Sequence, residues 1–166
     1  MQARDVALTG VMIALVTVVT LFVRLPSGIG YFNLSDTAIY FAAFAFGPLT
    51  GFLAGGVGTA LADLIGYPVF ALLTFFAHGL QGLVAGYVGR GGDWRRMLLG
   101  WALGTITMVG IYFVGEYWGA QFGWGGPPQA TADLPTNLIQ NLVGAVVSIP
   151  LVLAVRRAYP PLNRYT

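Results

Sequence analysis

Carboxylate and amide side chains stand at the ends of long apolar runs in this sequence. Glu116 closes one such run, and three amides, Asn137, Gln140 and Asn141, open the last one. Asn137 and Asn141 are four residues apart, so a helix places them on one face, which Gln140 adjoins. A carboxylate accepts hydrogen bonds from ring N–H or hydroxyl groups, and amides both donate and accept at the edge of a heterocycle. These residues therefore predict a pocket for a small, polar, ring-bearing ligand.

The composition places these polar groups in a membrane protein. Of the 166 residues, 57% are hydrophobic and 8% are charged, and the mean hydropathy is +0.75. Soluble domains carry about 25% charged residues, so this chain lies far outside that class. Its apolar runs do not alternate with polar residues as the strands of a membrane β-barrel do. We therefore predict an all-α, polytopic membrane protein, in which about 20 residues make each crossing.

The apolar runs predict a single domain, residues 1–166, built as a bundle of six transmembrane helices. The expected helices cover about 5–23, 36–46, 48–65, 69–88, 97–115 and 136–155. Residues 24–35 and 116–135 contain glycine and proline at several positions, and we expect both segments to be loops. The glycine pairs Gly51/Gly55 and Gly82/Gly86 each fall on one helix face, where they allow helices to pack closely.

The arginines sort to one side of this six-helix arrangement. All eight basic residues are arginines, and seven of them fall on the side that holds both termini, whereas the other side has only Arg24. Because cytoplasmic segments carry the excess of basic residues, both termini are predicted to be cytoplasmic. An arrangement of five or seven helices spoils this sorting.

The polar residues near helix ends have a second interpretation. Polar and aromatic side chains also gather at the membrane interface, where headgroups and water solvate them. This interpretation is favoured for Asp133, which lies in an expected loop. Glu116, Asn137 and Gln140 lie at or inside helix ends, so ligand binding is favoured for these three residues.

Three polar residues lie deeper in the apolar runs. Asp63 either caps a neighbouring loop or lines the pocket, and both interpretations stay open. His78 and Gln81 lie inside one helix, and a lone membrane histidine more often makes a hydrogen bond between helices than binds a ligand. The sequence has no cysteine, one histidine and no HExxH, GxSxG or Walker glycine motif. We therefore predict no enzyme activity, no metal site and no cofactor.

Small residues recur on one face of the first expected helix. Ala3 and Ala7 are four residues apart, and so are Gly10 and Ala14, so each pair falls on one helix face. Such a face lets another helix approach closely. The strip either packs inside the protein or meets a partner, and the spacing alone leaves both interpretations open.

Four stretches of the sequence resemble a known family. They are FNLSDTAIYFAAFAFGPLTGFLAGGVGTALADL, YPVFALLTFFAHGLQGLVAG, YFVGEYW and LPTNLIQNLVGAVVSIPL, and together they cover most of the chain. In order and spacing they resemble the substrate-binding S components of energy-coupling factor (ECF) vitamin transporters, most closely the riboflavin- or hydroxymethylpyrimidine-type branch.

The resemblance implies a protein of the prokaryotic cytoplasmic membrane that captures a vitamin or vitamin precursor from outside with high affinity. Uptake then depends on a transmembrane coupling subunit and two cytoplasmic ATPases, which form the shared module of this type of ABC transporter. The alternative is a small structural membrane subunit or a lipid-modifying enzyme, neither of which binds a soluble ligand.

The resemblance also implies roles for particular residues. The docking face of the family falls on Ala7, Gly10 and Ala14, with glycine at position 10 where alanine is usual. Family pockets use the loop after the first helix and the outer parts of the last three helices. This carries ligand binding over to Asn33, Asp36, Tyr112, Glu116, Asn137, Gln140 and Asn141. Further candidates are Asp63, His78, Gln81, Tyr117 and Trp118. Ligand contacts vary with the substrate across the family, so the resemblance does not imply which vitamin is bound.

Overall fold

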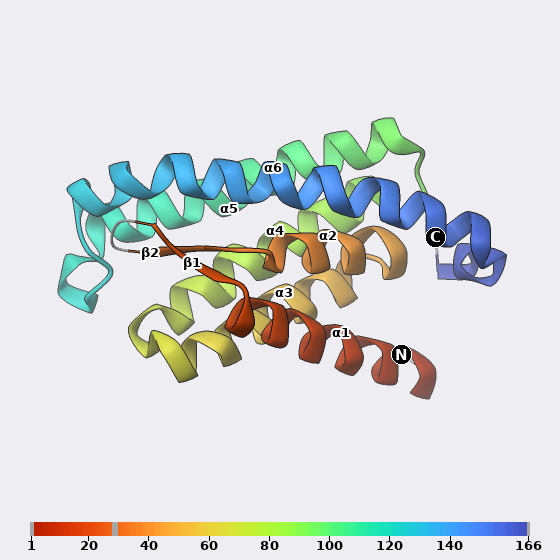
Figure 1. Ribbon diagram of the computed structural model, residues 1–166, viewed down its shortest axis with the longest axis horizontal. Coiled ribbons are helices and arrows are strands. Elements are labelled where there is room, and N and C mark those ends of the chain that lie inside the picture. Colours follow the sequence, from red (N-terminus) through yellow and green to blue (C-terminus); the bar gives the residue numbers. More distant parts are fainter. Residues whose placement is uncertain (1, 28–29, 166) are drawn as a thin grey trace.

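The structure, a computed structural model, describes residues 2–27 and 30–165 and is almost entirely helical (Figure 1). Within these residues the α-helices are α1 (Ala3–Phe22), α2 (Ser35–Phe46), α3 (Pro48–Gly66), α4 (Ala71–Gly89), α5 (Trp94–Trp118) and α6 (Pro127–Ala158). The strands β1 (Arg24–Ser27) and β2 (Gly30–Asn33) form an antiparallel hairpin. Short 3-10 helices are η1 (Pro68–Phe70), η2 (Ala120–Phe122) and η3 (Pro160–Tyr165). The predicted helical bundle is confirmed, and the hairpin is an addition to it.

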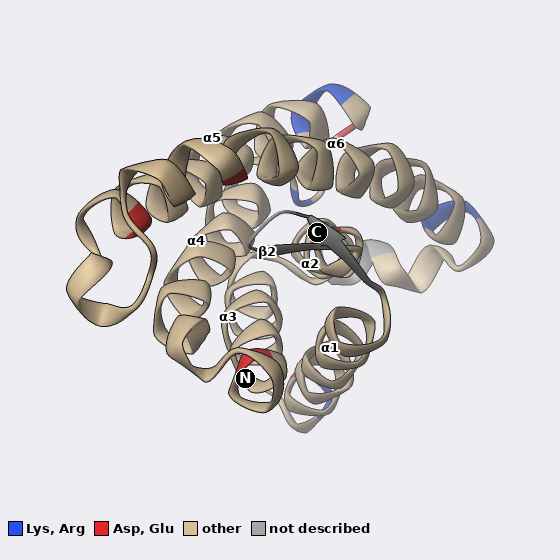
Figure 2. Ribbon diagram, turned by 60° about the vertical axis from the view of Figure 1, so that its left-hand side comes forward, with Lys and Arg blue, Asp and Glu red and all other residues tan. Residues whose placement is uncertain are grey.

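Within the described part of the chain, five helices are long and apolar enough to cross a membrane: α1, α3, α4 together with η1, α5 and α6. The protein is therefore a multi-pass membrane protein. The sixth helix, α2, has 12 residues and at about 1.5 Å per residue is too short to cross alone. It lies at the centre of the bundle, where it packs against α1, α3, α4 and α6 (Figure 2).

Glycines bring α3 and α4 into backbone contact, as their spacing predicts. A Cβ atom at Gly51 would lie 2.6 Å from the carbonyl oxygen of Gly82, closer than real Cβ atoms approach. A Cβ atom at Gly55 would collide in the same way with the carbonyl group of His78. Only glycine permits this approach, and the approach holds His78 and Gln81 of α4 in the middle of the bundle.

Both chain termini lie at the same end of the bundle (Figure 1). The junction between α4 and α5 lies at that end as well. The helix ends gathered there carry most of the arginines, namely Arg4, Arg90, Arg95, Arg96, Arg156 and Arg157. Arg24 belongs to the hairpin at the opposite end. The predicted sorting of arginines thus corresponds to two ends of one bundle.

The expected loop at residues 116–135 is wrong for most of its length. α5 continues to Trp118 and α6 begins at Pro127, so the last helix starts well before the predicted residue 136. Pro127 is in the first turn of α6, where its missing N–H has no helical partner to lose. Gly126 comes just before it with a φ of 145°, a conformation that favours glycine. Glycine and proline here start a helix instead of marking a long loop.

Two other boundaries differ from the prediction. α5 begins at Trp94 instead of residue 97, because the Asp93 carboxylate caps it by accepting the backbone N–H of Arg96 at 3.1 Å. The expected loop at residues 24–35 contains the hairpin, and α2 begins at Ser35.

Candidate functional site

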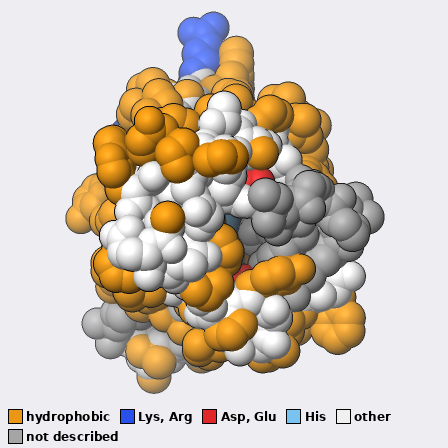
Figure 3. Space-filling model, turned by 90° about the vertical axis from the view of Figure 1, so that its left-hand side faces the viewer, with side chains coloured by type: hydrophobic (Ala, Val, Ile, Leu, Met, Phe, Trp, Pro, Cys, Tyr) orange, Lys and Arg blue, Asp and Glu red, His pale blue; other side chains and the backbone are white. Residues whose placement is uncertain are grey.

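A polar cavity of about 70 Å³ lies at the end of the bundle opposite the termini, which faces the viewer in Figure 3. All the long helices and the hairpin contribute to its wall. Its lining consists of Thr20, Asn33, Thr59, Asp63, Tyr67, Phe70, Thr74, His78, Met108, Tyr112, Glu116, Asp133, Thr136, Asn137 and Gln140. The structure therefore brings together seven of the predicted site residues: Asn33, Asp63, His78, Tyr112, Glu116, Asn137 and Gln140.

Asp36, in the first turn of α2, lies beneath the cavity and is fully buried. Its Oδ1 accepts a hydrogen bond from Gln81 Nε2 at 2.9 Å, and its Oδ2 accepts one from Gln140 Nε2 at 3.1 Å. His78 Nδ1 lies 3.3 Å from Asp36 Oδ1. A buried carboxylate is costly unless such donors satisfy it. Asp36 thus fixes two residues of the lining, His78 and Gln140, without belonging to the lining itself.

Asn141 forms a second buried junction, one helical turn from Asn137. Its Oδ1 accepts hydrogen bonds from Tyr40 Oη at 2.6 Å, Gln81 Nε2 at 2.7 Å and Thr105 Oγ1 at 3.1 Å. The side chain is fully buried, and like Gln81 it stays outside the lining. Asn141 and Gln81 therefore join α2, α4, α5 and α6 below the cavity, where they support the residues above.

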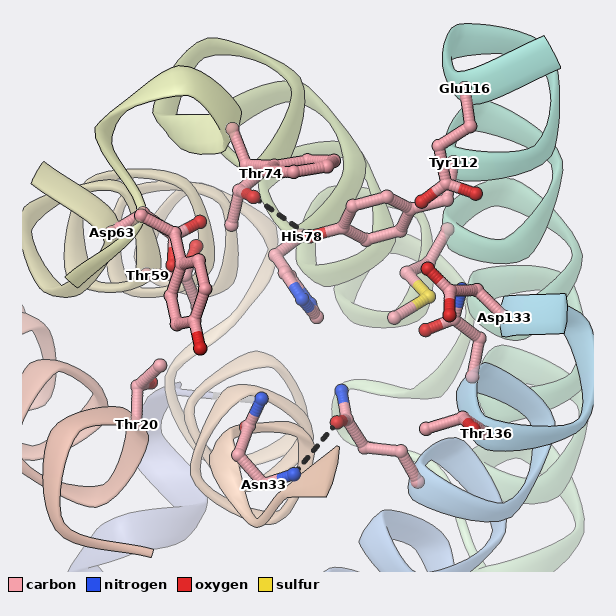
Figure 4. Close-up of a pocket in the computed structure, with 15 residues that line it drawn as sticks. Thr20, Asn33, Thr59, Asp63, Thr74, His78, Tyr112, Glu116, Asp133 and Thr136 are labelled. Carbon is pink, nitrogen blue, oxygen red and sulfur yellow. Dashed lines mark hydrogen bonds between the residues drawn. The ribbon is translucent and has the colours of Figure 1, made fainter. Parts of the chain in front are cut away.

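His78 contacts Asp36 of the neighbouring helix α2, as the interpretation favoured from the sequence expects. It belongs to the cavity lining, and its Nδ1 lies 2.8 Å from Gln81 Oε1. Gln81 Oε1 and the Asp36 carboxylate are both acceptors, so Nδ1 carries the proton that they share. The ring also meets Tyr112 edge to face, with the ring centroids 5.7 Å apart. These contacts orient the histidine ring, which points into the cavity (Figure 4).

Glu116 forms part of the wall on α5 and is 2% exposed. Its Oε2 has no hydrogen-bond partner among the described residues. The Asp133 carboxyl group on α6 is close enough to interact with the Glu116 carboxyl group through charge and through a side-chain hydrogen bond. Tyr112, one turn below Glu116, donates a hydrogen bond from its hydroxyl to Thr74 Oγ1 at 2.9 Å, and this bond joins α5 to α4 (Figure 4).

Tyr117 and Trp118 were candidate site residues, but the structure places both outside the cavity lining. They end α5 with 39% and 64% of their surfaces exposed, and their rings contact each other with centroids 4.9 Å apart. This position at the end of a membrane helix is typical of interfacial aromatic residues.

Sequence reasoning missed the four threonines of the lining, which are Thr20, Thr59, Thr74 and Thr136. A usable signal was their spacing from charged or amide residues. Thr59 is four residues before Asp63, and Thr74 is four residues before His78, so each pair shares a helix face. Asp133, assigned to the membrane interface by the sequence, also belongs to the lining and lies four residues before Asn137.

The described residues contain no cluster of three or more histidine or acidic side chains that could hold a metal ion. The polar groups of the lining are hydroxyl, amide, imidazole and carboxyl groups, which can make directed hydrogen bonds.

The small-residue strip of α1 lies on the outside of the bundle. Ala7, Gly10 and Ala14 are all exposed, and a Cβ atom at Gly10 would have no described atom within 4 Å. The opposite face of α1 holds the buried residues Thr9, Met12, Val16 and Thr20. The interpretation that the strip packs inside this chain is therefore wrong.

The fold and cavity define a multi-helix membrane protein with a cavity lined largely by polar side chains at one end. Residues 1–157 match the family described as "ECF-type riboflavin transporter, S component", and the chain belongs to this family. This is a family of transport proteins, so the prediction that the chain is not an enzyme is confirmed.

Curated relatives and solved structures are also similar to the chain. It is 39% identical to the "uncharacterized protein in gap 3'region" of Pyrococcus woesei, over 89% of this chain and 98% of that protein. It is 35% identical to a UPF0397 protein of Streptococcus thermophilus (strain CNRZ 1066), over 65% of this chain and 66% of that protein.

Two solved structures share the fold. The S component of a bacterial ECF transporter has a TM-score of 0.76 and 20% identity, over 95% of this chain and 98% of that one. FolT bound with folic acid has a TM-score of 0.67 and 21% identity, over 92% of this chain and 94% of that one.

Proposed function

We propose that the chain is the high-affinity substrate-binding subunit of an ECF-type transporter and captures a vitamin or vitamin precursor from outside the cell. The observation that carries this proposal is the polar cavity at one end of an otherwise apolar bundle. Amides and carboxylates inside a membrane protein cost free energy unless they have partners, so such a group of them is retained for function. Membership of the S-component family supports transport as that function.

The proposed partners are a transmembrane coupling subunit and two cytoplasmic ATPases, which drive uptake. The exposed strip of Ala7, Gly10 and Ala14 supports this, because small residues let a partner helix approach the backbone of α1 closely. The proposed site in the cell is the prokaryotic cytoplasmic membrane.

The proposed ligand site is the cavity at the end of the bundle opposite the termini, with Glu116, Asn137, Gln140, Tyr112 and Asn33 as binding residues. Asp36, Gln81 and Asn141 hold these residues in place from below. The cavity of about 70 Å³ is smaller than a cavity of about 150 Å³ that admits benzene. A heterocyclic ligand therefore requires side chains of the wall to move apart as it binds.

We expect alanine at position 116 or 137 to weaken ligand binding by about 1–3 kcal/mol, which is roughly ten- to a hundredfold in affinity. Each change removes one hydrogen-bonding group and leaves a polar group of the ligand buried without a partner. Native mass spectrometry of the gently purified protein would identify a bound vitamin, and isothermal titration calorimetry would then measure both variants. Gln121→Ala is the control, because Gln121 is exposed at the same end but lies outside the lining. Wild-type affinity in both pocket variants would place the binding site elsewhere.

The arginine-rich end of the bundle is proposed to face the cytoplasm, with both termini. Because the chain has no cysteine, single cysteines report the orientation directly. Tyr159 near the C-terminus and Gln121 near the cavity are both exposed and lie at opposite ends. We expect a membrane-impermeant maleimide to label Gln121→Cys in intact cells and to label Tyr159→Cys only after the membrane is opened. Equal labelling of both in intact cells would contradict this orientation.

A further inference from the structure

The amide groups below the cavity have one orientation that satisfies all their neighbours. Asn141 Nδ2 lies 2.9 Å from the backbone carbonyl oxygen of Asn137, which can only accept, so Asn141 Oδ1 must face Gln81. Gln81 therefore turns Nε2 toward this oxygen, at 2.7 Å, and its own Oε1 toward His78 Nδ1, at 2.8 Å. A backbone carbonyl group on α6 thus fixes, through two amides, a proton on Nδ1 of His78.

The Asp36 carboxyl group meets only hydrogen-bond donors among the described residues. Gln140 Oε1 accepts the backbone N–H of Asn33 at 3.0 Å, so Nε2 is the Gln140 atom that faces Asp36 Oδ2. At Oδ1 the donors are Gln81 Nε2 and His78 Nδ1. A protonated carboxyl group would need an acceptor for its own O–H, and none of these three groups is one. Asp36 is therefore ionised, although it is fully buried.

A buried negative charge requires a positive charge beside it. Among the described residues His78 is the only base in contact with Asp36, with Nδ1 3.3 Å from Oδ1. No described lysine or arginine side chain lines the cavity. The other ionisable side chains of the lining are acids or phenols, namely Asp63 on α3, Tyr67 next to η1, Tyr112 and Glu116 on α5, and Asp133 on α6. His78 is thus the group that balances the charge of Asp36, as an imidazolium ring with N–H on both nitrogens.

The second ring nitrogen of His78, Nε2, is left for the cavity. The ring points into the cavity, and its polar contacts with described residues all use Nδ1 (Figure 4). Its edge-to-face contact with Tyr112, at a centroid distance of 5.7 Å, helps to keep the ring in this position. A buried N–H normally has an acceptor. A molecule that displaces water from the cavity must therefore supply an acceptor to Nε2.

On the basis of the proposed function, we infer that His78 is a specificity-determining residue whose Nε2–H donates a hydrogen bond to a ring nitrogen or carbonyl oxygen of the substrate. The substrate class is a heterocycle with such an acceptor on the edge that faces His78. Hydrogen bonds from a charged donor are stronger than those from a neutral one, so this contact contributes strongly to selection. Asp36 and Gln81 are positioning residues, because they hold the proton on Nδ1 from outside the lining.

The charge of His78 can be measured without any substitution. The chain has one histidine, so ¹⁵N-labelled histidine gives NMR signals from this ring alone. In the full-length, ligand-free protein at neutral pH, we expect both ring nitrogens to carry a proton. The protein is then saturated with the vitamin that co-purifies or, if none does, with the tightest-binding compound among riboflavin, hydroxymethylpyrimidine, thiamine and pantothenate. Saturation should shift the Nε2 signal more than the Nδ1 signal.

Two variants test the contribution of Nε2 to affinity. An asparagine amide lies as far from Cα as Nδ1 does, so His78→Asn keeps a donor for Gln81 but has no group at the position of Nε2. We expect isothermal titration calorimetry with the same compound to show binding roughly tenfold weaker or more. A glutamine amide reaches the position of Nε2, so His78→Gln should recover part of the loss. Gln121→Ala, at an exposed position outside the lining, is the control and should bind as the wild type does.

Each contrary outcome has a separate meaning. One unprotonated ring nitrogen in the ligand-free protein would show a neutral ring and overturn the donor assignment, with the proposed transport function intact. An unchanged Nε2 signal on saturation, together with wild-type affinity in His78→Asn, would show that the substrate does not contact His78. If no compound binds and none co-purifies, the proposed binding function fails, and the inference about its substrate fails with it.

Discussion

Tryptophan at position 10 or 14 should abolish uptake and leave ligand binding intact. Gly10 and Ala14 lie on the exposed face of α1, and the space outside Gly10 is empty of described atoms. In the proposed transporter a coupling helix packs against this strip, and small residues act there by allowing the two backbones to approach. A bulky ring prevents that approach. The ligand cavity, in contrast, meets α1 only at Thr20 on its opposite face.

The loss of transport is measured as uptake of labelled ligand into cells that contain the coupling subunit and ATPases. Ligand binding is measured by titration of the purified protein. Ile106→Trp is the matched control, because Ile106 is 68% exposed on α5 and lies outside the strip. This control should transport normally. If the α1 variants also transport normally, the strip faces lipid and the coupling subunit docks elsewhere.

Leucine at position 82 should prevent stable folding. A Cβ atom at Gly82 would lie 3.1 Å from the Cα of Gly51 and nearer still to the carbonyl group of Gly51. Both partners are backbone atoms of packed helices, so neither can move aside as a flexible side chain would. Overpacking in ordinary cores costs about 1–3 kcal/mol, and we expect the cost of this change to lie at or above the upper end of that range.

The thermal unfolding midpoint in detergent and the yield of monodisperse protein both report this effect. Gly110→Leu is the matched control, since a Cβ atom at Gly110 on α5 would have no described atom within 4 Å. Leucine also favours a helix over glycine by up to about 1 kcal/mol, so the control should be as stable as the wild type or more stable. An unchanged midpoint for Gly82→Leu would mean that α3 and α4 do not touch through their backbones.

The helices could be predicted from the sequence because long apolar runs have few other structures available in a membrane. The start of α6 could not be predicted. Glycine and proline usually mark a loop, but here Gly126 and Pro127 form the conformation that begins a helix. The hairpin could not be predicted either, because two four-residue strands are too short to show an alternating pattern of apolar and polar residues.

The sequence predicted several of the polar residues that line the cavity, but it did not predict how far along the helices the cavity extends. Asn137 and Asn141 share a face as predicted, yet Asn137 lines the cavity and Asn141 is buried below it. Helical spacing fixes the direction of a side chain but does not say where along the helix a cavity ends. The end of the cavity is set by the other helices, above all by α2. Its Asp36 accepts hydrogen bonds from Gln81 and Gln140, which are 45 and 104 positions away in the sequence.

The short central helix α2 also borders the cavity that we propose as the ligand site. With 12 residues at about 1.5 Å each, α2 is roughly 18 Å long. The hydrocarbon core is about 30 Å thick, roughly 12 Å more than the length of α2, and the cavity lies beyond the start of α2 at Asp36. One more turn at the start of α2 would shorten the space beyond that helix by about 5.4 Å, and one turn fewer would lengthen it by the same amount. In the proposed transporter, the size of an acceptable substrate would therefore depend on the length of one helix, with the five surrounding helices kept in position.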